Sequence, residues 1–456
     1  MKPKNELTRR QFLKSNLAAA LAASTFPAII SASALGKDGA IVPSGRIAFG
    51  AIGVGARGQD VLKHFLLQKD CQVVALCDVK KDVLAKAKGL VDEVYHNNDC
   101  TPIADFRELA ARKDIDAVLV ASTDHWHVLH ALAAVRAGKD VYVEKPLGLS
   151  LGQDQALRKE VLKRGRVFQF GTQQRSDKKF RLACELVRNG HIGKLKHVNF
   201  WAPPSTAGGS TKVVPPPATL DYEFWLGPAP RREHTESLTS NSNWWYVSDF
   251  ALGFIAGWGI HPLDIALWGA GELAAGVVEV SGKGVFPKSG LHDTATAWDI
   301  DFRFSTGLTM KSASTPAKGS LTEKLGEEWT ARYGPLRGHG TAFEGENGWI
   351  LVDRESIVTK PDSLVELELD PGNFPRKLAH SPDHVRNFLE AVKSRQATVS
   401  PIESAVQSDA LCHVSDIAVR LGRNLRYDTT AERMLHDKAA NQRLLVRPMS
   451  GDWKLG

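Results

Sequence analysis

Cysteine is scarce in this sequence, with five residues in 456. None forms a CxxC pair or lies beside histidines at the spacing of metal ligands, so the sequence assigns no metal-binding residue. A chain of this length also folds without a disulfide framework. We expect buried structural thiols, and an odd count leaves room for one free thiol. The five are Cys71, Cys77, Cys100, Cys184 and Cys412.

The sequence also lacks a stretch suited to a permanent membrane span. The N-terminal apolar stretch is short, rich in alanine and interrupted by Pro27. It follows Thr8-Arg9-Arg10-Gln11-Phe12-Leu13-Lys14 and precedes Ala32-Ser33-Ala34. Twin arginines, an apolar stretch and small residues in this order predict a twin-arginine export signal over residues 1–34 and a periplasmic protein. The alternative is a frayed N-terminal helix with two chance arginines.

Basic patches of the kind that bind nucleic acid are missing as well. The formal net charge is +7, but residues 1–34 hold five positive and one negative side chain, so +3 remains without them. No basic run carries interleaved aromatic residues. These observations exclude a nucleic-acid partner. The chain has the composition of a soluble globular protein and the length of about two domains.

From residue 46 onward, short apolar runs alternate with helical patterns. This alternation implies right-handed crossovers and a parallel sheet, and the unbroken apolar runs imply helices on both faces. We therefore predict a doubly wound α/β domain over residues 45–168. The expected strands are Ile47–Ile52, Val73–Cys77, Ala117–Ala121 and Val141–Val143, and the expected helices include Gln59–Leu67 and Val128–Ala137.

The pattern changes after Gly171, where we predict a second α/β domain over residues 169–456 with a large, open, mostly antiparallel sheet. A long connection rich in proline and glycine, Pro203–Pro230, is a candidate cover for a binding site. The expected strands are Lys196–Phe200, Val277–Val280, Ala297–Phe304, Leu308–Ser312 and Trp349–Val352, and the expected helices are Asp383–Lys393 and Ile402–Leu421.

A glycine-rich turn, Gly53-Val54-Gly55-Ala56-Arg57-Gly58, joins the first strand to the first helix. In this motif Gly53 permits the tight turn, Gly55 lets the backbone approach a pyrophosphate, and Gly58 lets helix and strand pack closely. Asp78 ends the second strand, where its carboxylate can accept hydrogen bonds from an adenosine ribose. The constellation predicts a nicotinamide dinucleotide site. Asp78 favours NAD over NADP because it repels a 2′-phosphate, an effect that nearby Lys80 and Lys81 soften.

Several further motifs resemble those of the glucose–fructose oxidoreductase and inositol dehydrogenase (Gfo/Idh/MocA) family. The most specific is Glu144-Lys145-Pro146, and the resemblance runs to about Asp428. It implies a Rossmann domain followed by a larger α/β domain, a sugar or polyol substrate, and a homo-oligomer formed through the open sheet. The other motifs are Ser122-Thr123-Asp124-His125-Trp126-His127, Gly171-Thr172-Gln173-Gln174-Arg175, Trp225-Leu226-Gly227-Pro228 and Gly257-Trp258-Gly259-Ile260-His261.

Lys145 follows a parallel strand, at the crevice where doubly wound sheets bind ligands. An ammonium there can neutralise a developing alkoxide or transfer a proton. The alternative is a surface lysine before a proline turn, and the resemblance favours the catalytic, nicotinamide-proximal role. From the same motifs we also assign Arg57, Ser122, His127 and Glu144 to the cofactor site.

His261 is the second catalytic candidate that the resemblance implies. Members of the family carry an aspartate four residues earlier, but this sequence has Gly257 there. Asp264, one helical turn further on, is the candidate replacement that orients His261. The alternative is a core histidine with Asp264 as a helix cap. Thr123 also stands where the family usually has proline. The candidates for the sugar pocket are Gln174, Arg175, Trp244, Trp245 and Tyr246.

These observations predict an exported NAD-dependent oxidoreductase that moves hydride to or from a hydroxyl-bearing carbon of a sugar. Because free NAD is scarce outside the inner membrane, we expect a tightly retained cofactor and redox-neutral chemistry. One alternative is an NAD-dependent glycosidase or lyase, in which transient oxidation permits elimination of the glycosidic bond. A second alternative is a nucleotide-binding protein without catalysis.

Overall fold

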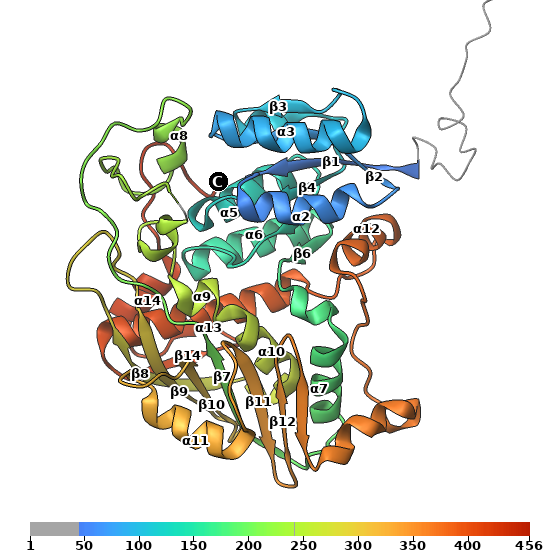
Figure 1. The fold of residues 1–456 in the computed structure, drawn as a ribbon, viewed down its shortest axis with the longest axis vertical. Coiled ribbons are helices and arrows are strands. Elements are labelled where there is room, and N and C mark those ends of the chain that lie inside the picture. The colour runs from blue at the N-terminus through green and yellow to red at the C-terminus, as the bar shows by residue number, and fades with distance from the viewer. Residues whose placement is uncertain (1–44, 241) are drawn as a thin grey trace, which may run out of the picture. The chain divides into compact units, whose positions relative to one another are not determined.

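A six-stranded parallel sheet forms the N-terminal half of the fold, in the order β3-β2-β1-β4-β5-β6 (Figure 1). The computed structural model describes residues 45–456 except Asn241, so the predicted export signal lies outside the described residues. The strands are β1 Ile47–Ile52, β2 Cys71–Cys77, β3 Thr101–Ile103, β4 Ala117–Val120, β5 Asp140–Val143 and β6 Phe168–Phe170. The strand order changes direction between β1 and β4, which is where doubly wound sheets bind ligands.

Helices cover both faces of this sheet. One face packs against α2, α3 and, from far along the chain, α12, in a core around Phe49, Phe65 and Phe388. The other face packs against α4, α5 and α6. The predicted domain boundary at residue 168 falls on the first residue of β6, which pairs with β5 in the parallel sheet. The helices are α2 Ala56–Leu66, α3 Lys81–Tyr95, α4 Phe106–Ala111, α5 Asp124–Arg136, α6 Leu151–Arg164 and α12 His384–Ser394.

The second sheet has nine strands in the order β13-β12-β11-β7-β10-β9-β8-β14-β15. Only β7 and β10 pair in parallel, so the sheet is mostly antiparallel, as the sequence predicts. The fold is therefore α/β in both halves. The strands are β7 Leu195–Ala202, β8 Val277–Val285, β9 Ala297–Phe304, β10 Thr309–Ser314, β11 Gly340–Gly345, β12 Trp349–Val352, β13 Ile357–Lys360, β14 Leu425–Asp428 and β15 Arg433–Met434.

Helices α7, α10 and α13 pack on the second sheet, and α13 also contacts α6 of the first half (Figure 1). Helix α11 packs through Trp329 against Trp201. In the described part of the chain all five cysteines are buried and unpaired, and no helix is long and apolar enough to cross a bilayer. The helices are α7 Lys178–Arg188, α8 Tyr222–Leu226, α9 Phe254–Gly257, α10 Ile260–Ala270, α11 Glu323–Tyr333, α13 Ile402–Leu421 and α14 Lys438–Leu445.

Candidate active site

The turn between β1 and α2 is packed on one side and open on the other. Gly53 has a φ of +80°, and a Cβ there would lie 2.4 Å from the backbone of Ser122. A Cβ on Gly58 would lie 2.1 Å from the carbonyl oxygen of Gly53. A Cβ on Gly55 would have no atom of the described residues within 4 Å. The turn therefore leaves the space that a pyrophosphate needs beside a helix N-terminus.

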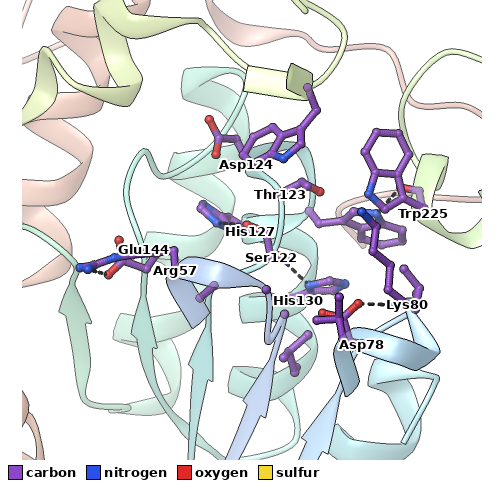
Figure 2. Close-up of a pocket in the computed structure, with 18 of the residues that line it drawn as sticks. Arg57, Asp78, Lys80, Ser122, Thr123, Asp124, His127, His130, Glu144 and Trp225 are labelled. Carbon is purple, nitrogen blue, oxygen red and sulfur yellow. Dashed lines mark hydrogen bonds and ion pairs between the residues drawn. The ribbon is translucent and has the colours of Figure 1, made fainter. Parts of the chain in front are cut away.

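Asp78 lies beside this turn, at the end of β2. Its carboxylate accepts hydrogen bonds from the backbone N–H of Val54 and of Lys80, both at 2.9 Å. Burial raises the pKa of this carboxyl group. The ammonium of Lys80 donates to the carbonyl oxygen of Thr239 at 2.6 Å. The position of Asp78 suits a ribose. Lys80 also lines the cavity, and its ammonium is engaged by Thr239 (Figure 2 labels Asp78 and Lys80).

A cavity of about 420 Å³ extends from the glycine turn and Asp78 to Lys145. Gly58 does not line it, because this glycine packs against Gly53 instead. The cavity also contains Trp244 and Trp245, two candidates for the sugar pocket. The predicted cofactor residues that line the cavity are Gly53, Gly55, Arg57, Asp78, Ser122, His127, Glu144 and Lys145. Figure 2 labels Arg57, Asp78, Ser122, His127 and Glu144 among them.

A segment of the second half closes one side of this cavity. We call residues 219–240 and 242–246 the cover segment; its cavity-lining members include Phe224, Trp225 and Thr239. The backbone N–H of Lys81 donates to Thr219 at 2.8 Å, and Asp221 donates to Val79 at 3.1 Å. The predicted cover at 203–230 therefore supplies only part of the wall, and the rest comes from residues further along the chain.

Two pairs of contacts fix the loops around Lys145. The guanidinium of Arg57 donates to the Glu144 carboxylate at 2.9 Å, and the amide of Gln173 donates to the same oxygen at 2.9 Å. The His127 ring lies 2.7 Å from the carbonyl oxygen of Pro146 and 3.0 Å from that of Ser122. These residues therefore hold the Glu-Lys-Pro loop against the β4–α5 turn.

Lys145 is buried at the inner end of the cavity. Its ammonium donates to the carbonyl oxygen of Gly257 at 2.7 Å and lies 4.7 Å from the centre of a ring of Trp245. Burial lowers the pKa of Lys145, and the carboxylates of Glu144 and Asp124 oppose this effect. Burial thus makes this lysine release its proton more readily than an exposed lysine does.

Asp124, at the start of α5, is the residue that sequence reasoning missed. Its side chain is 2% exposed, lines the cavity and interacts electrostatically with Lys145. One carboxylate oxygen accepts a hydrogen bond of 3.3 Å from the Trp245 indole, and the other has no hydrogen-bond partner among the described residues. Burial raises the pKa of Asp124 well above its usual value. The sequence signal that could have assigned Asp124 to the site is its position after β4, at the ligand-binding edge of the sheet.

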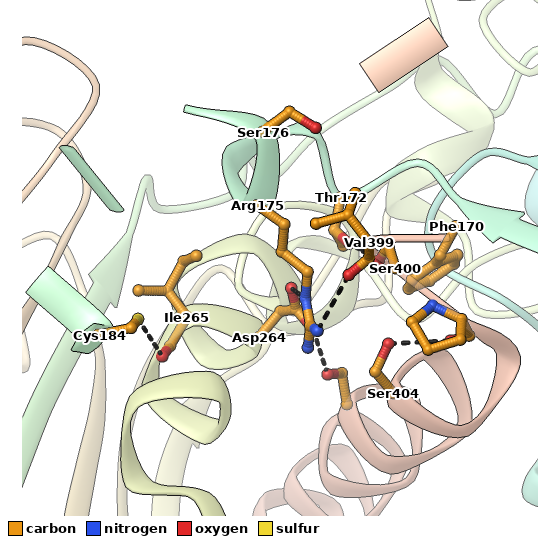
Figure 3. A network of polar contacts seen from close by, with 12 residues as sticks. Phe170, Thr172, Arg175, Ser176, Cys184, Asp264, Ile265, Val399, Ser400 and Ser404 are labelled. Atoms are coloured by element: carbon orange, nitrogen blue, oxygen red, sulfur yellow. Dashed lines mark hydrogen bonds and ion pairs between the residues drawn. The ribbon is translucent and has the colours of Figure 1, made fainter. Parts of the chain in front are cut away.

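The predicted pairing of Asp264 with His261 is wrong. Asp264 instead accepts two hydrogen bonds of 2.7 Å from Arg175 and one of 2.9 Å from Ser408 (Figure 3). His261 is 4% exposed, and its Nδ1 has no partner among the described residues. Burial, followed by the nearby charge of Lys145, lowers the pKa of His261 well below its usual value. This environment favours the neutral imidazole over the protonated one.

The remaining candidates for the sugar pocket, Gln174, Arg175 and Tyr246, do not line the cavity. Arg175 is buried in its ion pair with Asp264 and stacks 5.2 Å from a ring of Trp268, so its predicted role in the sugar pocket is wrong. Tyr246 packs against Phe254 and His292 and does not line the cavity. Gln174 is buried, and its amide has no hydrogen-bond partner among the described residues.

One buried cluster could hold a metal ion, although the sequence assigned none. The His413 Nε2 atom lies 3.4 Å from Asp154 and 3.3 Å from Asp409. Asp409 also accepts a hydrogen bond of 3.1 Å from the backbone N–H of Gly148, in the loop after Lys145. The cluster joins α6 and α13, and this packing of distant helices was not visible in the sequence.

Two family models match the chain. The first describes an oxidoreductase family with an NAD-binding Rossmann fold and matches residues 47–172. The second describes the C-terminal alpha/beta domain of an oxidoreductase family and matches residues 362–455. Both models are of the Gfo/Idh/MocA family. Residues 47–172 and 362–455 are therefore similar to the NAD-binding and the C-terminal domains of this oxidoreductase family.

The chain is also similar to individual proteins. A glycosyl hydrolase family 109 protein of Solibacter usitatus is 32% identical over 24% of this chain and 26% of its own length. A myo-inositol 2-dehydrogenase of Thermotoga maritima is 31% identical over 38% of this chain and 47% of its own length. The chain thus spans less than half of each. A scyllo-inositol dehydrogenase of Lactobacillus casei, solved with NAD(H) and scyllo-inositol, shares the fold (TM-score 0.56, 16% identity, 84% of this chain and 99% of that one).

Proposed function

We propose that this protein is an exported NAD-dependent oxidoreductase that moves hydride between a nicotinamide and a hydroxyl-bearing carbon of a sugar or sugar derivative. The observation that carries this proposal is the single cavity that contains both the glycine turn with Asp78 and the Lys145–Asp124 pair. The inositol dehydrogenase among the relatives supports a polyol-like substrate. The proposal that the protein is exported rests on Arg9-Arg10 and the residues after them.

The open side of the turn at Gly55 and the carboxylate of Asp78 fit a dinucleotide, with NAD favoured over NADP by the negative charge of Asp78. When bound, the nicotinamide accepts or returns the hydride. The protein's own side chains transfer the proton of the substrate hydroxyl group. Oxidation of a carbinol breaks its C–H and O–H bonds, and the hydroxyl proton passes to the deprotonated amine of Lys145. Asp124 and the Gly257 carbonyl then stabilise the resulting ammonium.

Gly257 stands where the family carries an aspartate, and Trp245 packs against it. A Cβ at Gly257 would lie 3.6 Å from the Trp245 ring, which is ordinary van der Waals contact. The same indole donates to Asp124. We infer that Asp124, brought in by α5, replaces the missing acid, and that His261 is the alternative proton acceptor.

The second candidate function is an NAD-dependent glycosidase or lyase, favoured by the relatives named glycosyl hydrolase family 109 proteins. In that reaction a ring carbinol would give its hydride to a bound nicotinamide and its hydroxyl proton to a base. The neighbouring C–H would lose a proton to a base, and the glycosidic oxygen would leave with a proton from an acid. Water would then add, and the hydride and a proton would return to the carbonyl group. The homo-oligomer implied by the open sheet stays a prediction.

Lys145→Ala tests the proposal. The substrates are myo-inositol, glucose, glucuronate and their methyl derivatives, and the readout is nicotinamide absorbance in single turnovers. We expect hydride transfer to slow on the order of 100-fold, because a proton-transfer group is lost, while bound NAD and thermal stability are unchanged. The control is Lys86→Ala on the exposed face of α3. Normal turnover in Lys145→Ala would contradict the proposal. Cleaved methyl glycosides without net oxidation would select the glycosidase instead.

A further inference from the structure

A group of basic side chains surrounds Trp258, next to the carbonyl group that holds Lys145. The Trp258 ring lies 5.9 Å from the ring of His261 and 5.7 Å from that of His339, measured between ring centres. The guanidinium carbon of Arg354 lies 4.9 Å from the centre of a Trp258 ring. We call these four residues the basic cluster.

The cluster is assembled from three separate parts of the fold. His261 is in the first turn of α10, His339 directly precedes β11, and Arg354 lies in the turn between β12 and β13. Strands β11 and β12 are antiparallel, with Thr341 paired to Val352, so the start of one and the end of the other lie at the same edge of the sheet. The Thr341 hydroxyl donates to the Pro262 carbonyl at 2.9 Å, which fixes this edge against α10.

The polar atoms of the basic cluster have no partners among the described residues. His261 and His339 are 4% and 8% exposed, and the Nδ1 atom of the first and the Nε2 atom of the second are buried without a hydrogen bond. Arg354 is an exposed residue, and it makes no hydrogen bond or ion pair with the described part of the chain. A buried polar group without a partner costs free energy, so the two buried imidazole nitrogens, beside an arginine that is free to bind, point to a missing ligand.

The acids closest to Arg354 in the chain are already committed to other groups. Arg337 lies 3.2 Å from Asp353 and 3.9 Å from Glu355. Asp353 also accepts backbone N–H bonds from Glu355 and Ser356. Arg354 thus stays free of a carboxylate partner, although two acids flank it in the sequence.

Positive groups also dominate the electrostatic surroundings of His261. After burial, the charged groups with the largest effect on the pKa of His261 are Lys145, Arg354, Arg57 and His339, and each of them lowers it. Burial and the charge of Arg57 also lower the pKa of Arg354. An anion placed here would relieve these repulsions.

We propose that the basic cluster binds an oxyanion carried by the substrate, so that the sugar is an acidic one bearing a carboxylate or a sulfate ester. The fork of the Arg354 guanidinium matches the planar geometry of a carboxylate, and the two imidazoles supply further donors. Because Gly257, which holds Lys145, is adjacent to Trp258 in the chain, an anion bound here would set the distance from the reacting carbon to Lys145. This inference rests on the proposed function and names its substrate class.

The test compares acidic and neutral sugars on the NAD-loaded protein. Glucuronate, glucose 6-sulfate and glucose are offered to the wild type and to Arg354→Gln, and both KM and the dissociation constant from calorimetry are measured. We expect the wild type to bind one acidic sugar at least roughly tenfold more tightly than glucose, and Arg354→Gln to lose this preference, as for loss of a charge-assisted hydrogen bond. Glucose turnover and NAD content should not change. The comparison of glucuronate with glucose 6-sulfate then shows whether the site prefers a carboxylate or a sulfate ester.

Lys360→Gln, an exposed lysine on β13 of the same sheet, is the control for a general loss of positive charge and should keep the preference. Equal affinity of the wild type for glucose and both acidic sugars would overturn the inference, as would an equal loss for all three sugars in Arg354→Gln. Weaker NAD binding in Arg354→Gln would assign the arginine to the cofactor instead. If glucose reduces the bound cofactor while the acidic sugars do not bind, the proposed function stands and this inference fails.

Discussion

Single glycines decide whether the first turn can serve a dinucleotide, and the three glycines do so in different ways. Gly53 and Gly58 are required by the protein's own backbone, because a Cβ at either position would meet backbone atoms. Gly55 is not required by any neighbouring atom of the described chain, and its missing side chain leaves space in the cavity. The first two therefore serve the fold, and the third serves the ligand.

Two substitutions separate these roles. Gly55→Ala should leave the melting temperature unchanged and weaken NAD binding roughly 10- to 100-fold, because its methyl group enters the space proposed for the pyrophosphate and overpacking costs about 1–3 kcal/mol. Gly58→Ala should lower the melting temperature itself, because the new Cβ would lie 2.1 Å from the Gly53 oxygen. Thermal unfolding and calorimetry with NAD provide the measurements. A folded Gly55→Ala variant with wild-type affinity for NAD would show that the pyrophosphate lies elsewhere.

The residues that could be predicted from sequence are those that follow strands of the parallel sheet. The glycine turn, Asp78 and Lys145 each follow a strand, and the ends of parallel strands meet at one edge. Asp264 was assigned to His261 because they lie one helical turn apart, yet its partner Arg175 is 89 residues away. Arg354 reaches the site only through the pairing of β11 with β12, which the sequence does not specify.

At the scale of elements, apolar runs located most of the strands correctly. The six-stranded sheet needed no long-range information, because its strands follow one another with helical crossovers. Helix α12 was predicted as a helix, but its packing on the N-terminal half was not. The contact depends on Asp70, directly before β2, which accepts hydrogen bonds from Arg386 at 2.6 and 2.8 Å and from Lys393 at 2.5 Å.

Asp70→Asn should loosen this contact in a pH-dependent way. Burial opposes ionisation of Asp70, but Arg386 and Lys393 outweigh it and lower the pKa from 3.8 to about 2. A lowered pKa in the folded state means that the wild type gains stability above pH 3.8 and loses it as the pH falls toward 2. We expect the variant to lose about 1–2 kcal/mol of unfolding free energy at neutral pH, and the difference to shrink in acid.

Denaturant titrations of wild type and Asp70→Asn across this pH range measure the effect. The matched control is Asp114→Asn, an exposed carboxylate that pairs with Arg112 at 2.6 Å and should contribute little. A constant difference between wild type and Asp70→Asn at all pH values would show that the charge of Asp70 is not what holds α12.

At the scale of the whole molecule, distant parts of the chain close the cofactor cavity. The cover segment is bound to the β2–α3 loop, and its Trp225 carbonyl accepts a hydrogen bond of 2.9 Å from the Trp126 indole. The C-terminal residues pack on the same side: Trp453 contacts Trp126 with ring centres 4.8 Å apart, and Ser450 donates to Pro228 at 3.0 Å. We expect these contacts to slow the release of a bound dinucleotide.

This closure supports the expectation that the protein keeps its cofactor through each turnover. Such retention suits an exported enzyme, because free NAD is scarce outside the inner membrane. The most direct measurement is prolonged dialysis of the native protein, followed by mass spectrometry of the released nucleotide and by turnover assays without added NAD. We predict close to one nicotinamide dinucleotide per chain and undiminished redox-neutral turnover. Protein that emerges without nucleotide, with activity that returns only in proportion to added NAD, would contradict the account.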